Sequence, residues 1–339
     1  MEKSRQDYSK MTIEERQHMV ENLFVVYPRI RAILNKIAYC HQHAKIAAEP
    51  DGMLLEGVAG TGKTTLGRYY SRAHPREVTE DGRVVRILTT KVEVPASPKS
   101  LVSALLADLG DPLSDKGSTV SQTIRLRKLM KDCGTELVVL DEFQHFIDRD
   151  SKKVLKTISD WLKNLMDSTR TPVILMGMPY SHTILDAEGN EQLQRRFSTR
   201  ISLEPFNWEN HGDRQDFRKF LGTVDKNLPL NEWSNLSDLS TAFRFNLASD
   251  GVISRVMKVV RRAASIALEL SKERLDLDVL SIAYEECLAA NAPQKENPFD
   301  ADMRQKKVKP PERDKSASRA TNNRSKAKEK TLTASDVLK

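Results

Sequence analysis

Cysteine residues and long apolar runs are both scarce in this sequence of 339 residues. The three cysteines, Cys40, Cys133 and Cys287, are widely spaced and odd in number, which argues against a disulfide framework or a zinc site. The apolar runs, such as residues 137–140 and 173–176, are far shorter than the roughly 20 residues of a transmembrane helix. The N-terminus also lacks the apolar core of a signal peptide. We therefore expect a reduced, cytoplasmic, globular protein with no membrane segment.

Net charge is absent from most of the chain. Residues 301–339 contain 12 Lys and Arg against 5 Asp and Glu, and this excess equals the formal charge of +7 for the whole sequence. Residues 1–300 therefore sum to zero, so bulk charge gives no argument for a basic surface on the body. Residues 291–339 are rich in Pro, Lys, Ser, Ala and Asn without periodicity, which predicts a disordered basic tail. This tail is either a tether for a partner or a solubilising extension.

Short apolar strands alternate with amphipathic helices in the central part of the chain, a pattern typical of an α/β domain with a parallel sheet flanked by helices. We expect strands at residues 52–56, 84–88, 137–140, 173–176 and 201–203, and helices at 12–49, 63–74, 98–109, 119–132 and 151–168. Only helical periodicity follows, at residues 213–222, 235–247, 252–272 and 276–289. The pattern predicts a helical segment over 1–50, an α/β domain over 51–205, a small all-α domain over 206–290 and the tail.

A glycine-rich loop follows the first predicted strand, and residues 57–64 fit the pattern G-x-x-x-x-G-K-[ST]. Glycines let several backbone N–H groups point at one phosphate chain, and the helix that begins here offers its positive end to the anion. We expect Lys63 to reach the β- and γ-phosphates of ATP and the Thr64 hydroxyl to hold Mg²⁺. The alternative is an ordinary strand-to-helix turn. The expected nucleotide-binding residues are Gly57, Gly60, Thr61, Gly62, Lys63, Thr64 and Thr65.

A carboxylate pair ends the third predicted strand. Asp141 comes 77 residues after Thr64 and is expected to bind Mg²⁺, mostly through water. Glu142 is expected to orient or deprotonate the water that attacks the γ-phosphate, which favours hydrolysis over transfer to a small molecule. An apolar strand that simply ends in acidic residues is the alternative for this pair.

Several segments make the sequence similar to a known family. They are residues 26–29 (Val-Tyr-Pro-Arg), 57–65, 140–145 (Leu-Asp-Glu-Phe-Gln-His), 177–179 (Gly-Met-Pro), 192–197 (Gln-Leu-Gln-Arg-Arg-Phe) and 251–255 (Gly-Val-Ile-Ser-Arg). In this order they resemble the TniB/TnsC family of AAA+ ATPases, the ATP-dependent regulators of DNA transposition. The resemblance covers roughly residues 20–270, and it implies an AAA+ P-loop NTPase fold in which residues 206–290 form a helical lid domain.

The resemblance also implies partners. A protein of this family binds ATP, assembles as a homo-oligomeric ring or filament on double-stranded DNA, receives a signal from a TniQ-type targeting adaptor and recruits the transposase. ATP hydrolysis then dismantles the assembly, and the basic tail is expected to dock on the transposase or on DNA. Two alternatives remain: a signalling or adaptor NTPase that acts on protein partners without DNA, and an AAA+ protein of the helicase-loader type.

AAA+ sites are completed by an arginine of the neighbouring subunit. Arg195 and Arg196 match the Arg-Arg-Phe segment of the family, so each is a candidate, and a local salt bridge, for example with Glu191, is the alternative. Arg255 fits a sensor that reports the nucleotide to the lid, or else belongs to a solvated basic helix face. The fourth strand ends without the polar side chain that often senses the γ-phosphate in AAA+ proteins. Either a backbone group or Thr171 senses the phosphate instead, or hydrolysis is slow.

Contacts with DNA are expected at phosphates and are therefore independent of base sequence. No zinc finger or helix-turn-helix pattern is evident in the sequence, which suits such binding. Each basic cluster also has the simpler interpretation of a solvated helix face. The candidate contacts are Lys99, then Arg125, Arg127, Lys128 and Lys131, and then Arg149, Lys152 and Lys153.

Overall fold

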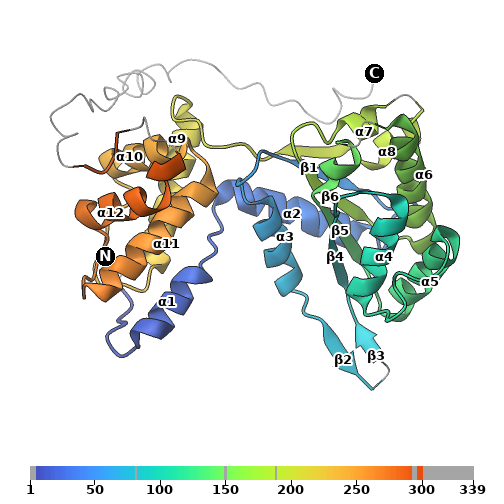
Figure 1. Ribbon diagram of the computed structural model, residues 1–339, viewed down its shortest axis with the longest axis horizontal. Coiled ribbons are helices and arrows are strands. Elements are labelled where there is room, and N and C mark those ends of the chain that lie inside the picture. The colour runs from blue at the N-terminus through green and yellow to red at the C-terminus, as the bar shows by residue number, and fades with distance from the viewer. Residues whose placement is uncertain (1–4, 81, 149–150, 188, 292–295, 301–339) are drawn as a thin grey trace, which may run out of the picture. The chain divides into compact units, whose positions relative to one another are not determined.

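The computed structural model describes residues 5–80, 82–148, 151–187, 189–291 and 296–300. Its central sheet consists of β1 (Met53–Glu56), β4 (Ile87–Lys91), β5 (Leu137–Asp141), β6 (Val173–Gly177) and β7 (Thr199–Ser202). The strands lie in the order β4-β5-β6-β1-β7 and every neighbouring pair is parallel (Figure 1). All carboxyl ends therefore meet at one edge of the sheet, which we call the carboxyl edge, and the starts of the strands form the amino edge.

Helices cover both faces of this sheet, because successive strand side chains point to opposite sides. Leu55, Val139 and Met176 belong to a core shared with α2 (Pro28–His43) and α3 (Lys63–Arg72). Leu54 and Leu140 belong to the opposite core, which contains α4 (Pro98–Leu109), α5 (Thr119–Asp132) and α6 (Lys152–Thr169). The expected parallel sheet flanked by helices is confirmed.

Two expected elements are each divided in the structure. The strand expected at 84–88 is replaced by β4 and by a hairpin of β2 (Glu77–Thr79) and β3 (Gly82–Val84), in which Val84 pairs with Glu77. The helix expected at 12–49 is two helices, α1 (Ile13–Glu21) and α2, because the chain is extended before Pro28, which opens α2. Three short elements carry too few residues to show periodicity: η1 (Phe143–Phe146), α7 (Thr183–Asp186) and α8 (Glu191–Arg196).

Among the described residues, the only regular elements after β7 are helices. They are α9 (His211–Asn227), α10 (Leu239–Ser249), α11 (Ile253–Glu269), α12 (Leu277–Cys287) and the short η2 (Ala289–Asn291). Helix α1 packs on α11, and its buried Arg16 contacts the segments that follow α9 and α11, by donating to the Pro229 carbonyl and by pairing with Glu273 at 2.6 Å. The domain division at 51, 206 and 291 stays a prediction, and the tail over 301–339 lies outside the described residues. In the part of the chain that the structure describes, no helix is long and apolar enough to cross a membrane.

Candidate nucleotide-binding site

The loop between β1 and α3 forms a compact cradle at the carboxyl edge. Gly60 and Gly62 have φ values of +84° and +104°, which side chains with a Cβ rarely adopt. The side chain of Thr61 is buried and donates to the Val58 carbonyl, which closes the loop on itself. The Leu66 amide is the first in α3 to reach a carbonyl one turn earlier, that of Gly62 at 2.9 Å. The preceding amides of the helix therefore face the cradle, where an anion can accept from them.

Lys63 opens α3 with its ammonium group folded over the cradle. Its Nζ donates to the carbonyls of Gly57 and Val58. Burial lowers the pKa of Lys63, and the nearby carboxylates of Asp141 and Glu142 only partly oppose this effect. A phosphate group in the cradle would favour the charged form of this lysine and would give its three donors a better acceptor than two backbone carbonyls. The residues present fit a polyphosphate.

Thr64 connects the cradle to β5. Its hydroxyl donates to Oδ2 of Asp141 at 2.6 Å, and Oδ1 of the same carboxylate accepts from the Glu142 backbone N–H at 2.9 Å. A hydroxyl and an oriented carboxylate are the oxygen donors that Mg²⁺ takes together with phosphate oxygens and water. Among the described residues no group of three His, Cys, Asp or Glu side chains could hold a metal by itself. The pair therefore fits a metal that arrives with a nucleotide.

Glu142 follows Asp141 in a left-handed conformation with φ of 58°, which costs energy for a residue other than glycine. This turn directs the chain from β5 into η1, and Glu142 lines the same cavity as Lys63 and Thr64. Its Oε2 accepts from the side-chain amide of Gln144 at 2.5 Å. The structure thus brings the carboxylate expected as the base to the phosphate end of the cavity.

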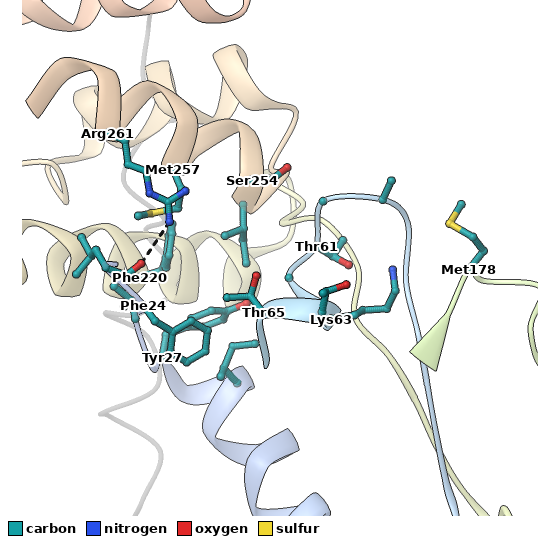
Figure 2. Close-up of a pocket in the computed structure, with 18 of the residues that line it drawn as sticks. Phe24, Tyr27, Thr61, Lys63, Thr65, Met178, Phe220, Ser254, Met257 and Arg261 are labelled. Atoms are coloured by element: carbon teal, nitrogen blue, oxygen red, sulfur yellow. Dashed lines mark hydrogen bonds between the residues drawn. The ribbon is translucent and has the colours of Figure 1, made fainter. Parts of the chain in front are cut away.

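The opposite end of this cavity is apolar (Figure 2). It is lined by side chains from the segment before α2, from the first turn of α2 and from α9 and α11: Leu23, Phe24, Val25, Tyr27, Ile30, Phe220, Ile253 and Met257. Phe24 stacks on Tyr69 with ring centroids 4.4 Å apart, and Tyr27 meets Phe220 edge-on at 5.4 Å. Apolar walls beside a phosphate cradle suit a molecule with a planar base at one end and phosphates at the other.

Helix α11 reaches the cradle with its first turn. The Ser254 N–H donates to the Gly60 carbonyl at 3.0 Å, and a Cβ built on Gly60 would lie 2.2 Å from the Ser254 hydroxyl. Arg255, which sequence reasoning chose as the sensor, pairs instead with Asp250 at 2.6 Å and does not line the cavity. Arg261 does line it, two turns further along α11, and donates to the Leu23 carbonyl (Figure 2). Its face could have been found from the spacing of Ser254, Met257 and Arg261 at i, i+3 and i+7.

The two adjacent arginines of α8 differ in their surroundings. Arg196 is buried, and its guanidinium lies 2.5 Å from Asp167 and 3.3 Å from Glu49 of the same chain. This engagement argues against Arg196 as the residue that reaches a neighbouring subunit, and its partners are not the Glu191 that sequence proximity suggested. Arg195 is exposed, and within the described residues no ion pair or hydrogen bond engages its side chain. It is the better candidate of the two.

The basic candidates for DNA contact lie at different edges of the sheet. Lys99 begins α4 after β4, and Lys152 and Lys153 begin α6 after β5, so these three lysines lie toward the carboxyl edge. Arg127 and Lys131 lie near the end of α5, which leads into β5 at the amino edge. The remaining candidates are either engaged or not described: Arg125 pairs with Asp111, Lys128 pairs with Asp132, and Arg149 lies outside the described residues.

Thr171 is not at the site. It is buried at the start of β6, where its hydroxyl donates to the Thr169 carbonyl, so it lies at the edge of the sheet opposite the cradle. The polar group next to the end of β6 is instead Gln144, whose side-chain oxygen accepts from the Met178 N–H at 3.2 Å. Recognising it required the pairing of β5 with β6, which the sequence does not state.

Comparisons with known proteins agree with this geometry. Residues 16–208, more than half of the chain, match the family model described as bacterial TniB protein. The fold is similar to Cdc6p of Pyrobaculum aerophilum (TM-score 0.58, 14% identity, 80% of this chain and 71% of that one). It is also similar to Aeropyrum pernix ORC1 in complex with DNA (TM-score 0.56, 18% identity, 80% and 69%) and to ORC2 of the same organism (0.54, 16%, 80% and 72%). No curated protein matches the sequence.

The structural likenesses establish the fold, which is that of the AAA+ P-loop NTPases. The family match rests on the sequence itself and covers α2, the cradle, β5 and the helix that carries Arg195. The chain belongs to the bacterial TniB family.

Proposed function

We propose that this protein is an ATP-dependent regulator of DNA transposition that assembles on double-stranded DNA with ATP and dissociates after hydrolysis. One observation carries the proposal: Lys63, the Thr64–Asp141 pair and Glu142 converge on one cavity at the carboxyl edge, in a chain of the TniB family. In the assembly it connects a TniQ-type target selector to the transposase.

The cradle binds the phosphates of ATP through the amides at the start of α3 and through Lys63, which leaves its backbone carbonyls for the nucleotide. The apolar end holds the base between the segment before α2 and α11. Because α11 also contacts Gly60 directly, nucleotide binding fixes the position of the lid. Lys63, Gly57, Gly60, Thr61, Gly62, Thr64 and Thr65 form the phosphate site in this proposal.

Thr64 and Asp141 hold Mg²⁺, which neutralises charge on the phosphates when it is bound. Glu142 accepts a proton from the attacking water, and its fixed position at the end of β5 orients that water toward the γ-phosphate. Arg195 of a neighbouring subunit completes the site from outside, so ATP joins subunits and hydrolysis weakens their contact.

DNA is held through its phosphates. Lys99, Lys152 and Lys153 follow the carboxyl ends of β4 and β5 and are exposed, so they are the first choice for these contacts. The ORC1 protein of similar fold is in complex with DNA, which supports a nucleic acid as the partner. Phosphate contacts predict affinity that falls steeply with salt and depends little on base sequence.

The test uses Glu142→Gln, which keeps the shape of the side chain and removes the base. We expect this variant to bind ATP and duplex DNA, to hydrolyse ATP about 10²-fold more slowly or worse, and to accumulate long-lived oligomers. Hydrolysis rates and light scattering on duplex DNA, first with ATP and then with ADP, measure these effects. Glu136→Gln is the matched control. Glu136 immediately precedes β5 at the amino edge of the sheet, far from the cradle, so this substitution should leave the rate of ATP hydrolysis unchanged.

Two outcomes would contradict the proposal. Equal assembly with ATP and ADP would remove the nucleotide switch. Assembly that depends on ATP but is unaffected by duplex DNA would favour the alternative of an NTPase that acts on protein partners.

A further inference from the structure

Gln144 lies in η1, three residues after Asp141, the last residue of β5. The side chain is buried, with 5% exposure, and lines the nucleotide cavity. Its amide bridges two parts of the chain, because Nε2 donates to Oε2 of Glu142 at 2.5 Å and Oε1 accepts from the Met178 backbone N–H at 3.2 Å. One amide therefore spans from the expected base to the residue that follows β6.

The orientation of this amide is determined by its partners. The Met178 N–H can only donate, so it must face the carbonyl oxygen of Gln144. The ionised Glu142 carboxylate can only accept, so it must face the NH₂ group. The two contacts demand the same assignment, and exchanging the oxygen and nitrogen of the amide would break both.

The loop after β6 is packed closely at this point. A Cβ built on Gly177 would lie 2.2 Å from the Ser181 hydroxyl and 3.1 Å from Oε1 of Gln144, so the backbone there approaches the amide with no room for a side chain. The same loop is held at two further places: the Tyr180 hydroxyl donates to Asp148 at 2.8 Å, and the His182 N–H donates to Glu56 at 2.7 Å. Helices α7 and α8, the second of which carries Arg195, follow directly.

We propose that Gln144 is a positioning residue that fixes the Glu142 carboxylate and makes its placement depend on the loop between β6 and α7. This inference rests on the proposed ATP hydrolysis. The amide engages Oε2 of Glu142, which leaves Oε1 to accept the proton of the attacking water. The other end of the amide is anchored to backbone, so a shift of the loop that leads to Arg195 moves the base as well.

The first test compares kcat with ATP affinity. Gln144→Leu removes both contacts, and we expect kcat to fall about 10–100-fold while the Kd for ATP changes little and the Tm falls no more than in the control, because a base displaced by about 1 Å is ineffective. Gln122→Leu is the matched control: Gln122 is also fully buried and donates twice, to Ser103 and to the Ser114 carbonyl, but lies in α5. This control should lose Tm and keep kcat.

The second test isolates the contact with Glu142. Gln144→Glu keeps an oxygen for the Met178 N–H but places a second carboxylate beside Glu142, and like charges favour protonation of one of them. We expect the acid limb of the kcat–pH profile to move to higher pH in this variant, with partial recovery of kcat at alkaline pH. A role limited to packing would lower kcat equally at every pH.

The outcomes separate the inference from the function on which it rests. Wild-type protein that hydrolyses no ATP on duplex DNA would overturn the proposed function. Wild-type hydrolysis with normal kcat in Gln144→Leu, or an unshifted pH profile in Gln144→Glu, would overturn the inference alone.

Discussion

At the carboxyl edge of the sheet, polar side chains bond to one another beside the glycine-rich cradle, whereas at the amino edge similar side chains bond to one another near the starts of the strands. Thr64 donates to Asp141 and Gln144 donates to Glu142 at the first edge, where Glu142 also has a positive φ. Burial lowers the pKa of Lys63 there. The backbone of Glu142 and the charge of Lys63 are thus both held in states that cost free energy, which is typical of ligand-binding sites.

At the amino edge, charged and polar side chains pair with one another. His41 is buried between the Tyr70 hydroxyl at 2.9 Å and Glu136 at 3.0 Å, and Lys45 also pairs with Glu136 at 2.7 Å. Burial raises the pKa of Tyr70 to about 12, so its hydroxyl stays a donor. Arg196 pairs with acidic partners at this edge too, near the start of β1, where its carbonyl accepts from the Gly52 N–H. His41, Lys45, Glu136 and Arg196 each have a partner within the chain.

This difference shows that residue type alone does not distinguish residues that act in the nucleotide site from residues that stabilise the fold. Both edges pair carboxylates with cations or hydrogen-bond donors, and a cavity lies at each, but at the carboxyl edge these side chains meet the glycine-rich cradle and the left-handed Glu142. Substitutions at the carboxyl edge should therefore change activity more than stability, and substitutions at the amino edge should do the reverse.

The largest effect is expected at Lys63. Lys63→Ala removes the side-chain cation that faces the cradle, so the Kd for ATP should rise about 10²-fold or more while the Tm without nucleotide stays near that of wild type. Lys131→Ala, an exposed lysine of the amino edge, is the matched control. Titration with a fluorescent ATP analogue measures both variants. Wild-type ATP affinity in Lys63→Ala would refute the assignment of the cradle.

The two arginines of α8 give the next largest contrast. Arg195→Ala should keep ATP binding and Tm but lower DNA-stimulated kcat by about 10³-fold, because the missing group belongs to the neighbouring site. Arg196→Ala should instead cost about 1–2 kcal/mol of unfolding free energy, since its partner Asp167 is 41% exposed and partly screened. Thermal unfolding and hydrolysis rates on duplex DNA separate the variants. A large loss of kcat in Arg196→Ala together with a loss of stability in Arg195→Ala would contradict these assignments.

Much of the site can be predicted from the sequence because its functional side chains occur in short runs of consecutive residues. The loop over 57–64 directly follows one strand, and the pair Asp141–Glu142 stands at the end of another. Each is a run of consecutive residues whose neighbours have the sequence pattern of a strand, a turn or a helix. The parallel sheet followed from apolar strands alternating with helices. What these predictions share is that no contact between distant segments was needed to make them.

The missed features all depend on such contacts. Gln144 gains its position only because β6 lies beside β5, and Arg261 because α11 folds over the cradle. Arg196 is paired with Asp167 and Glu49, which are far away in the sequence. The segment before Pro28 is extended rather than part of one long helix, and its apolar residues Leu23, Phe24 and Val25 line the wall of the cavity.

The smallest effect concerns the pH dependence of stability at the amino edge. Burial lowers the pKa of His41, and the hydrogen bond to Glu136 offsets this only in part. Burial alone would raise the pKa of Glu136, but hydrogen bonds from Lys45 and His41 bring it below its usual value. The unfolded chain therefore takes up both protons at higher pH than the folded one, so the stability contributed by this cluster is lost as the pH falls. For His41 the loss begins near its unfolded pKa of about 6.5.

His41→Gln tests this account, because an amide can bond to both Tyr70 and Glu136 but cannot titrate. Between about pH 7.5 and pH 5.5 the Tm of wild type should fall by a few degrees more than that of the variant, while ATP hydrolysis at pH 7.5 stays equal. His74, whose ring lies 5.3 Å away, is a second imidazole beside His41, so His74→Gln is measured in parallel to separate the contributions of the two rings. Identical Tm–pH curves for wild type and His41→Gln would show that the amino edge is insensitive to acid. A loss of hydrolysis in His41→Gln would contradict the division between the two edges, because it would mean that residues of the amino edge also determine the activity of the nucleotide site.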